Sequence, residues 1–235
     1  MQILAATDFS TRSQRAVRRA GLLAQSTGAD LALVHVVDDD QPRDLIEVER
    51  REAEGILTEQ IKVMAELPSD QCRPIVAVGD PFDGILRAAA ATSADIIVMG
   101  AHRKQLLRDI FVGTTIERVI RKGPYPVLMV NNEARQPYGS AVAAVHMSKL
   151  SANAVRAAES TDLVGNGRIT LIHAFGALGK MSVAGLEHAS VDEFVASERK
   201  RAMRELVAFL DARNLADHRW SLRVQEGAAL KVISL

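Results

Sequence analysis

The segment 100–115 brings together residue types that bind anions. Gly113 directly precedes Thr114 and Thr115, and the apolar positions that follow have helical spacing. The first N–H groups of a helix have no intrahelical acceptor, and the helix dipole adds partial positive charge there. A helix that begins at this point could therefore bind phosphate, with the two threonine hydroxyl groups as further donors.

Gly100 and three basic residues belong to the same segment. We expect Gly100 to let the backbone turn sharply off the end of an apolar run. Arg103, Lys104 and Arg108 place positive charge in the segment, although the last two are also explained as solvated loop charges. A loop between a strand and a helix with an ordinary N-cap is the alternative interpretation, and the local pattern does not decide between the two.

Short apolar runs precede this segment and recur along the first half of the chain. We predict strands over residues 3–7, 31–37, 73–78, 94–99 and 126–130, with helices between them. Continuous apolar strands that alternate with helices indicate a parallel sheet covered on both faces. The first half is therefore predicted to be an α/β domain with a doubly wound, Rossmann-like sheet of five parallel strands.

Ligands of such sheets bind at the carboxyl ends of the strands, where the strand order reverses. Asp8 follows the first predicted strand and Gly100 follows the fourth. The two residues flank one crevice if these strands are neighbours. Asp8 could act there as a hydrogen-bond acceptor or as a general base, although no residue pattern positions a water for hydrolysis.

Several separated motifs resemble the universal stress protein family. Residues 7–10 read T-D-F-S after the first strand, and residues 33–36 read L-V-H-V in the second strand. The fourth strand leads into Gly100, and Gly113-Thr114 closes the loop after it, as in that family. The resemblance covers residues 1–132, which we predict to be the first domain.

The resemblance implies a function and a site. In the nucleotide-binding branch of the family, the loop wraps the phosphates of ATP, which is therefore the implied cofactor, with or without Mg²⁺. Asp8 would contact the nucleoside, Val36 would flank the base, and the loop would hold the phosphates. The residues implied for the site are Asp8, Val36, Met99, Gly100, His102, Arg103, Gly113, Thr114 and Thr115.

One position departs from the family pattern, because Arg103 stands where the family has a glycine. If this position requires a positive φ, an arginine costs about 1–2 kcal/mol. Alternatively, the guanidinium group supplies a cation to the phosphates. The nine-residue spacing between Arg103 and Gly113 is intact.

The second half of the chain resembles the first. Residues 131–139 form a polar linker in this interpretation, and residues 143–155 then match residues 5–17 at six of thirteen positions. We therefore predict an internal repeat and a second, incomplete domain of the same type over residues 140–235. This domain lacks a fourth strand and a glycine loop, and His146 replaces Asp8, so we expect it not to bind nucleotide.

Two histidines occupy matching places on the second strands of the two halves, His35 and His173. A metal pair is one interpretation, but a strand-end histidine with a local hydrogen bond is the favoured one. Neither a zinc-ligand spacing nor a Ser-His-Asp pattern stands out, so no metal site and no catalytic residue is predicted.

Composition limits the partners. Lys and Arg number 29, Asp and Glu number 29, and the formal net charge of +0 gives no general attraction to nucleic acid or anionic membranes. Cys72 is the single cysteine, which fits a reducing compartment. The N-terminus lacks the pattern of a signal peptide, and no apolar run approaches the about 20 residues of a membrane helix. We expect a cytoplasmic protein with neither nucleic acid nor membrane as partner.

Three functional hypotheses follow. The leading one is an ATP-binding regulatory module for stress responses, with slow or no turnover, and not an enzyme. The second is an interaction protein of the same family that has lost nucleotide binding. The third is a nucleotide-using transferase, for which the sequence offers no visible acceptor site. We also expect a homodimer through the fifth strand, because an apolar strand at a sheet edge invites pairing.

Overall fold

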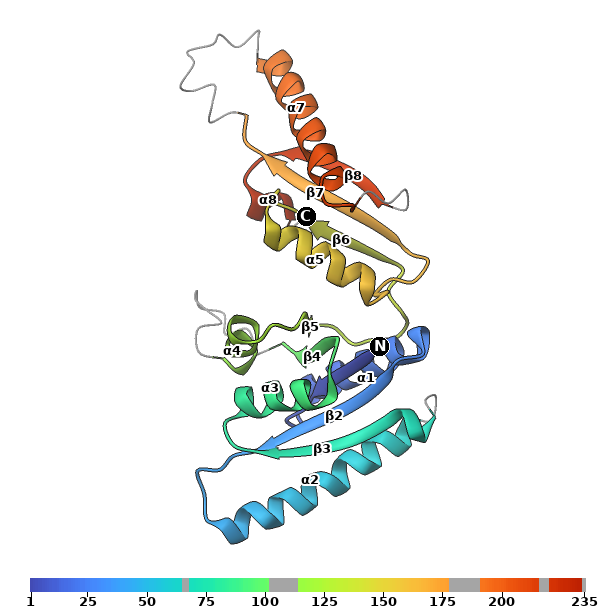
Figure 1. The fold of residues 1–235 in the computed structure, drawn as a ribbon, viewed down its shortest axis with the longest axis vertical. Coiled ribbons are helices and arrows are strands. Elements are labelled where there is room, and N and C mark those ends of the chain that lie inside the picture. The colour runs from blue at the N-terminus through green and yellow to red at the C-terminus, as the bar shows by residue number, and fades with distance from the viewer. Residues whose placement is uncertain (65–67, 102–113, 178–190, 216–219, 234–235) are drawn as a thin grey trace. The chain divides into compact units, whose positions relative to one another are not determined.

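The computed structural model describes residues 1–64, 68–101, 114–177, 191–215 and 220–233. The chain forms two compact units, Met1–Pro137 and Tyr138–Leu235, which are described separately (Figure 1). Three of the residues expected at the site, His102, Arg103 and Gly113, lie outside the described residues.

The first unit is built on a five-stranded sheet with the order β3-β2-β1-β4-β5, in which every pairing is parallel. The strands are β1 (Gln2–Ala6), β2 (Asp30–Val37), β3 (Cys72–Val78), β4 (Ile96–Gly100) and β5 (Val127–Val130). The predicted fold class is confirmed. The first and fourth strands are neighbours, which was the condition for Asp8 and Gly100 to flank one crevice. The strand order reverses between β1 and β4.

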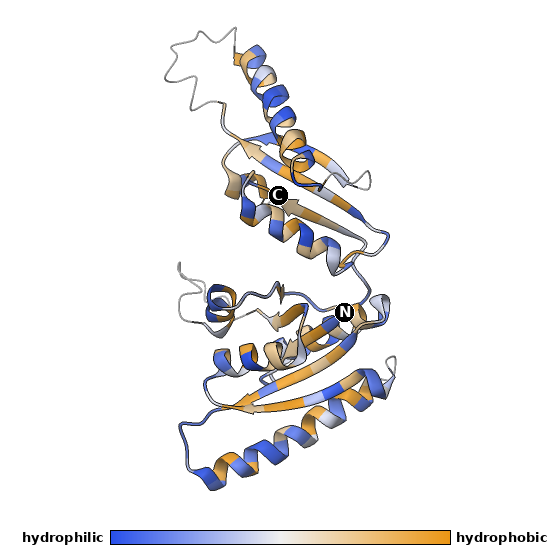
Figure 2. Ribbon diagram, viewed as in Figure 1, coloured by the Kyte–Doolittle hydropathy of each residue, from blue (hydrophilic) through white to orange (hydrophobic). Residues whose placement is uncertain are grey.

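Helices cover both faces of this sheet. They are α1 (Thr11–Thr27), α2 (Arg43–Val63), α3 (Pro81–Thr92) and α4 (Thr115–Lys122), with a short 3-10 helix at Ser69–Gln71. The consecutive β1 residues Ile3, Leu4 and Ala5 are fully buried although their side chains alternate between the faces. Figure 2 accordingly shows hydrophobic strands between helices of mixed character.

The segment that follows β5 belongs to the first unit. Ala134 is fully buried, and Arg19 in α1 donates a hydrogen bond to the backbone oxygen of Gln136 at 2.8 Å. Arg15 reaches the backbone oxygen of Asn131 at 3.2 Å. Most of the polar stretch predicted as a linker therefore packs on α1, because its backbone carbonyl groups accept hydrogen bonds from arginines of that helix. The sequence pattern gave no reason to connect these arginines with the stretch.

The second unit is a smaller α/β unit in which strands again alternate with helices. Its elements are β6 (Ser140–Ala144), α5 (Lys149–Ser160), β7 (Arg168–Phe175), α7 (Val191–Asp211), β8 (Trp220–Glu226) and α8 (Ala229–Ile233). Within the described residues, its strands form a three-stranded parallel sheet in the order β6-β7-β8. Leu171 of β7 and Leu206 of α7 are fully buried at the centre of its core.

Individual contacts recur in the two units. Nδ1 of His35 lies 2.9 Å from the backbone oxygen of Thr7, and Nδ1 of His173 lies 2.9 Å from the backbone oxygen of Val145. The favoured interpretation of both histidines is confirmed in part: each ring forms a hydrogen bond, but its partner is 28 residues away at the end of the neighbouring strand and is not local. Because a carbonyl oxygen only accepts, Nδ1 carries the proton in both rings.

The helix caps recur in the same way. Ser10 caps α1 and accepts a hydrogen bond from the backbone N–H of Ser13 at 3.3 Å. Ser148 caps α5 and accepts one from the backbone N–H of Ser151 at the same distance. The identities that indicated an internal repeat thus include the residues that begin the first helix of each unit. In the described parts of the chain, no helix has the length and apolar character needed to cross a membrane.

Candidate functional site

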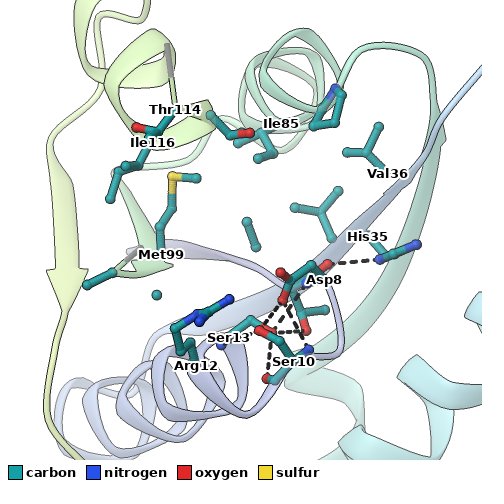
Figure 3. A pocket seen from close by; sticks show the side chains of 17 residues that line it. Asp8, Ser10, Arg12, Ser13, His35, Val36, Ile85, Met99, Thr114 and Ile116 are labelled. Carbon is teal, nitrogen blue, oxygen red and sulfur yellow. Dashed lines mark hydrogen bonds between the residues drawn. The ribbon is translucent and has the colours of Figure 1, made fainter. Parts of the chain in front are cut away.

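A pocket lies in the first unit at the carboxyl ends of β1 and β4, where the strand order reverses (Figure 3). Six of the residues expected at the site line it, namely Asp8, Val36, Met99, Gly100, Thr114 and Thr115. They come from four different segments of the chain, which the sheet topology brings together. Ligands of open parallel sheets bind at such a crevice.

Asp8 follows β1 and organises the turn that leads into α1. Its Oδ1 accepts hydrogen bonds from the backbone N–H of Ser10 at 3.0 Å and from the Ser10 hydroxyl at 2.5 Å. Burial raises the pKa of the Asp8 carboxyl group, but hydrogen bonds from Ser10, Ser13 and the backbone outweigh this effect and hold the pKa below its usual value. The pocket therefore contains a carboxylate that is ionised at neutral pH.

Phe9 gives this turn its shape. Its φ is 60°, a left-handed conformation that is uncommon for a residue with a side chain. The conformation lets the Phe9 ring stack on the imidazole of His35, with 4.2 Å between the ring centroids. The stacked pair and the hydrogen bond from His35 to Thr7 fix the wall of the pocket beside Asp8.

Val36 forms the wall on the other side, and Gly84 of α3 packs directly against it. A Cβ atom at Gly84 would lie 2.7 Å from Cγ1 and 2.8 Å from Cγ2 of Val36. Only glycine therefore lets α3 approach Val36 this closely. Sequence reasoning did not single out Gly84, although a glycine inside an alanine-rich helix was an available signal.

Gly100 has a different task from the one expected. It is the last residue of β4 and is not one of the glycines with positive φ, so the chain does not need it for a sharp turn. A Cβ atom at Gly100 would lie 2.7 Å from the backbone oxygen of Arg12 and 3.0 Å from the backbone nitrogen of Ser13. Glycine is required because the first turn of α1 packs against the end of β4.

Thr114 and Thr115 begin α4, as the sequence indicated. Thr114 is the N-cap, and its hydroxyl oxygen accepts a hydrogen bond from the backbone N–H of Glu117 at 3.3 Å. The cap explains Thr114 structurally without excluding an anion, because the first N–H groups of the helix still lack intrahelical acceptors. Glu117, in the first turn, forms an ion pair with Arg121 at 2.9 Å.

A polar bridge joins the two helices that close the pocket on this side. Asp80 caps α3 through the backbone N–H of Phe82, and its other carboxylate oxygen lies 2.8 Å from the guanidinium group of Arg118 in α4. That guanidinium group also lies over the Phe82 ring, 3.7 Å from its centroid. The bridge holds the start of α3 against α4, and both helices contribute residues to the pocket.

The pocket also contains a cation that sequence reasoning missed. Arg12, in the first turn of α1, lines the pocket, and its side chain extends into it in Figure 3. Its position two residues after the Ser10 cap was visible in the sequence, but nothing there told which face of α1 it occupies. An ionised Asp8, Arg12, apolar walls and a helix start thus surround one space.

The five-stranded order and the pocket at its reversal point define a doubly wound α/β domain with a ligand-binding crevice. The model of the universal stress protein family matches residues 1–131. The chain therefore belongs to the universal stress protein family, and the resemblance seen in the sequence is confirmed for these residues.

Curated relatives match the same part of the chain. A universal stress protein of Methanocaldococcus jannaschii is 29% identical over 154 residues, which cover 56% of this chain and 95% of that protein. A universal stress protein of Thermus aquaticus is 33% identical over 135 residues, which cover 54% of this chain and 96% of that protein. The second unit is not part of the family match.

A solved structure extends the likeness in fold. The crystal structure of a universal stress protein from Archaeoglobus fulgidus has a TM-score of 0.67 and covers 99% of this chain and 80% of that chain. The sequence identity is 17%, so the likeness concerns the fold alone.

Proposed function

We propose that the first unit binds an adenine nucleotide, with ATP as the expected ligand, and acts as a regulatory module. The observation that carries the proposal is the convergence of Asp8, Val36, Met99, Gly100, Thr114 and Thr115 on one pocket. The resemblance to the nucleotide-binding branch of the family implies these same residues from sequence motifs alone. Residues chosen for unrelated reasons have no cause to meet at a topological switch point.

Each side of the pocket has its task in this proposal. The ionised carboxylate of Asp8 accepts hydrogen bonds from the hydroxyl groups of the nucleoside. Val36 and Met99 offer apolar surface to the base. The start of α4 faces the phosphates with the backbone N–H groups of Thr115 and Ile116 and with the hydroxyl group of Thr115. The resemblance adds His102, Arg103 and Gly113, which lie outside the described residues, to the phosphate side in this proposal.

In this proposal the protein itself makes few direct contacts with Mg²⁺. Asp8 is the one carboxylate that lines the pocket among the described residues, and it already accepts hydrogen bonds from Ser10. In the described parts of the chain there is also no group of three or more His, Cys, Asp or Glu residues that could hold a metal ion. A magnesium ion that accompanies ATP is therefore held mainly by phosphate oxygens and water.

The proposed module binds its ligand without fast turnover. Ligand binding would change a surface to which another protein binds. The second unit, in this proposal, is an incomplete domain of the same family that does not bind nucleotide. The recurring histidine contacts and serine caps support the relationship. His146 in place of Asp8 supports the absence of binding, because an imidazole does not replace an ionised carboxylate as acceptor.

Two observations favour the alternative, an interaction protein without nucleotide. The Thr114 hydroxyl group is used as a helix cap, and Glu117 places negative charge in the first turn of α4. Identification of the nucleotide in protein purified without added ligand decides between the two. We expect an adenine nucleotide in the heat-released fraction of wild-type protein and none after Asp8→Ala with Thr115→Val. ATP hydrolysis at the rate of a control without protein would indicate a binding module, and hydrolysis well above that rate would indicate an enzyme.

A further inference from the structure

We infer that Arg12 is a phosphate-binding residue and that the pocket thereby selects nucleotides over nucleosides. The inference rests on the proposed function, because it names the part of the ligand that one side of the same pocket binds. Neither the family resemblance nor sequence reasoning assigned a role to this residue.

The other arginines of α1 have a shared structural task. Arg15 and Arg19 donate hydrogen bonds to backbone oxygens of Asn131 and Gln136, and Arg18 lies 3.6 Å from the carboxylate of Glu133. Three arginines of this helix thus hold the segment after β5 against it. Arg12 is not part of this arrangement, and it forms neither a hydrogen bond nor an ion pair with the part of the chain that the structure describes.

The position of Arg12 in the pocket indicates which part of the ligand it meets. Its backbone packs against Gly100, at the end of the strand that leads into the loop. In Figure 3 its side chain extends into the pocket on the side away from Val36 and Ile85, which form the apolar wall. A base held against that wall directs its phosphates toward the side of Gly100 and Arg12.

The chemistry of the side chain agrees with this position. A guanidinium group has five N–H donors and no acceptor, so its partner must offer oxygen or nitrogen lone pairs. Phosphate oxygens match the fork of the guanidinium group and carry the opposite charge. Arg12 is half-buried, which strengthens a charged hydrogen bond relative to one made in water.

The second unit provides an internal comparison. Its residues Ser148 and Ser151 keep the capping contacts of Ser10 and Ser13. The residue that matches Arg12 at the same spacing is Leu150, which is 80% exposed. The positions needed for the helix cap are therefore retained, whereas the pocket-facing charge is lost in the unit that lacks the acidic residue. The helix cap therefore does not need the charge of Arg12, and we assign this charge to ligand binding in the pocket.

The test measures the affinities of ATP, AMP and adenosine for the full chain by titration calorimetry. Three proteins are compared: the wild type, Arg12→Gln, and Arg15→Gln as a control that removes the same charge from the outward side of the same helix. We expect Arg12→Gln to weaken ATP binding at least tenfold and to leave adenosine binding within twofold. Arg12→Lys should recover part of the loss, and Arg15→Gln should change neither affinity.

Other outcomes separate the inference from the proposed function. Equal ATP affinities of wild type and Arg12→Gln would overturn the role of Arg12 and leave the proposed function standing. Equal losses for ATP and adenosine would also overturn it, since Arg12 would then hold the nucleoside or the fold. A wild type that binds none of the three ligands would overturn the proposed function itself, and the role of Arg12 with it.

Discussion

Asp8 combines two tasks at the end of β1. Its hydrogen bonds with Ser10 begin the first helix, and its charge faces the pocket. The same combination holds for Gly100, which the resemblance connected with the ligand and which the packing of α1 requires in any case. Removing a residue that has both a structural and a ligand-binding role does not show which role was lost. Variants that change one role and keep the other are therefore needed.

Asp8→Asn removes the charge of the side chain and keeps its shape, because the amide oxygen can still accept hydrogen bonds from Ser10. The pKa of Asp8 is lowered in the folded protein, so its ionised form stabilises the fold above the unfolded pKa of about 3.9. This contribution is lost as the pH falls through the folded pKa. Urea unfolding should therefore show a wild-type advantage over Asp8→Asn that is constant from about pH 5 to 8 and shrinks below about pH 4. An advantage that grows on acidification would contradict the assignment.

Gly100→Ala tests the close approach of α1 to β4. Its Cβ atom would lie 2.7 Å from a backbone oxygen, which cannot rotate away as a side chain can. We expect a loss of about 1–3 kcal/mol in the free energy of unfolding, the usual cost of overpacking. Stability equal to the wild type would show that α1 shifts at no cost.

At the level of elements, α3 is placed by two devices, its glycine and its bridge to α4. Gly84→Ala should push α3 away from Val36, at a net cost of about 1–2 kcal/mol after the gain in helix propensity. Gly55→Ala in α2 is the matched control, because a Cβ atom there has no neighbour within 4 Å. The control should stabilise the protein by about 0.5–1 kcal/mol. Thermal unfolding of both variants measures the difference, and two effects of the same sign would contradict the packing argument.

The elements show how much the sequence could predict. All five strands of the first unit were found, because buried parallel strands are continuous apolar runs whose lengths differ from those of helices. The packing of Gly84 on Val36 and of residues 131–136 on α1 was not found. Both depend on contacts between segments far apart in the chain, which local pattern does not encode. The orientation of Arg12 was missed for the same reason.

At the scale of the whole molecule, the edges of the two sheets differ from their centres. β5 is an edge strand of the five-stranded sheet. β6 pairs with β7 alone within the described residues, and Val142 in β6 is 68% exposed, whereas its counterpart Leu4 in the central strand β1 is fully buried. Exposed apolar edges invite pairing with further strands.

The expected homodimer through β5 stays a prediction. Light scattering should give twice the mass of the chain for the wild type and the single mass for Leu128→Lys, because a charge in an edge strand opposes pairing. Val142→Lys, in the exposed edge strand of the other unit, is the control and should remain dimeric. A monomeric wild type at high concentration, or a dimeric Leu128→Lys variant, would exclude this edge as the interface.

We propose that one unit of the chain, and not the other, binds an adenine nucleotide at its topological switch point. The most direct measurement is the stoichiometry of ATP binding to the full chain by titration calorimetry. We expect one ATP per chain, and no binding by a Val36→Asp variant, whose charge replaces the apolar wall. Two equivalent sites per chain, or binding that survives Val36→Asp unchanged, would contradict it.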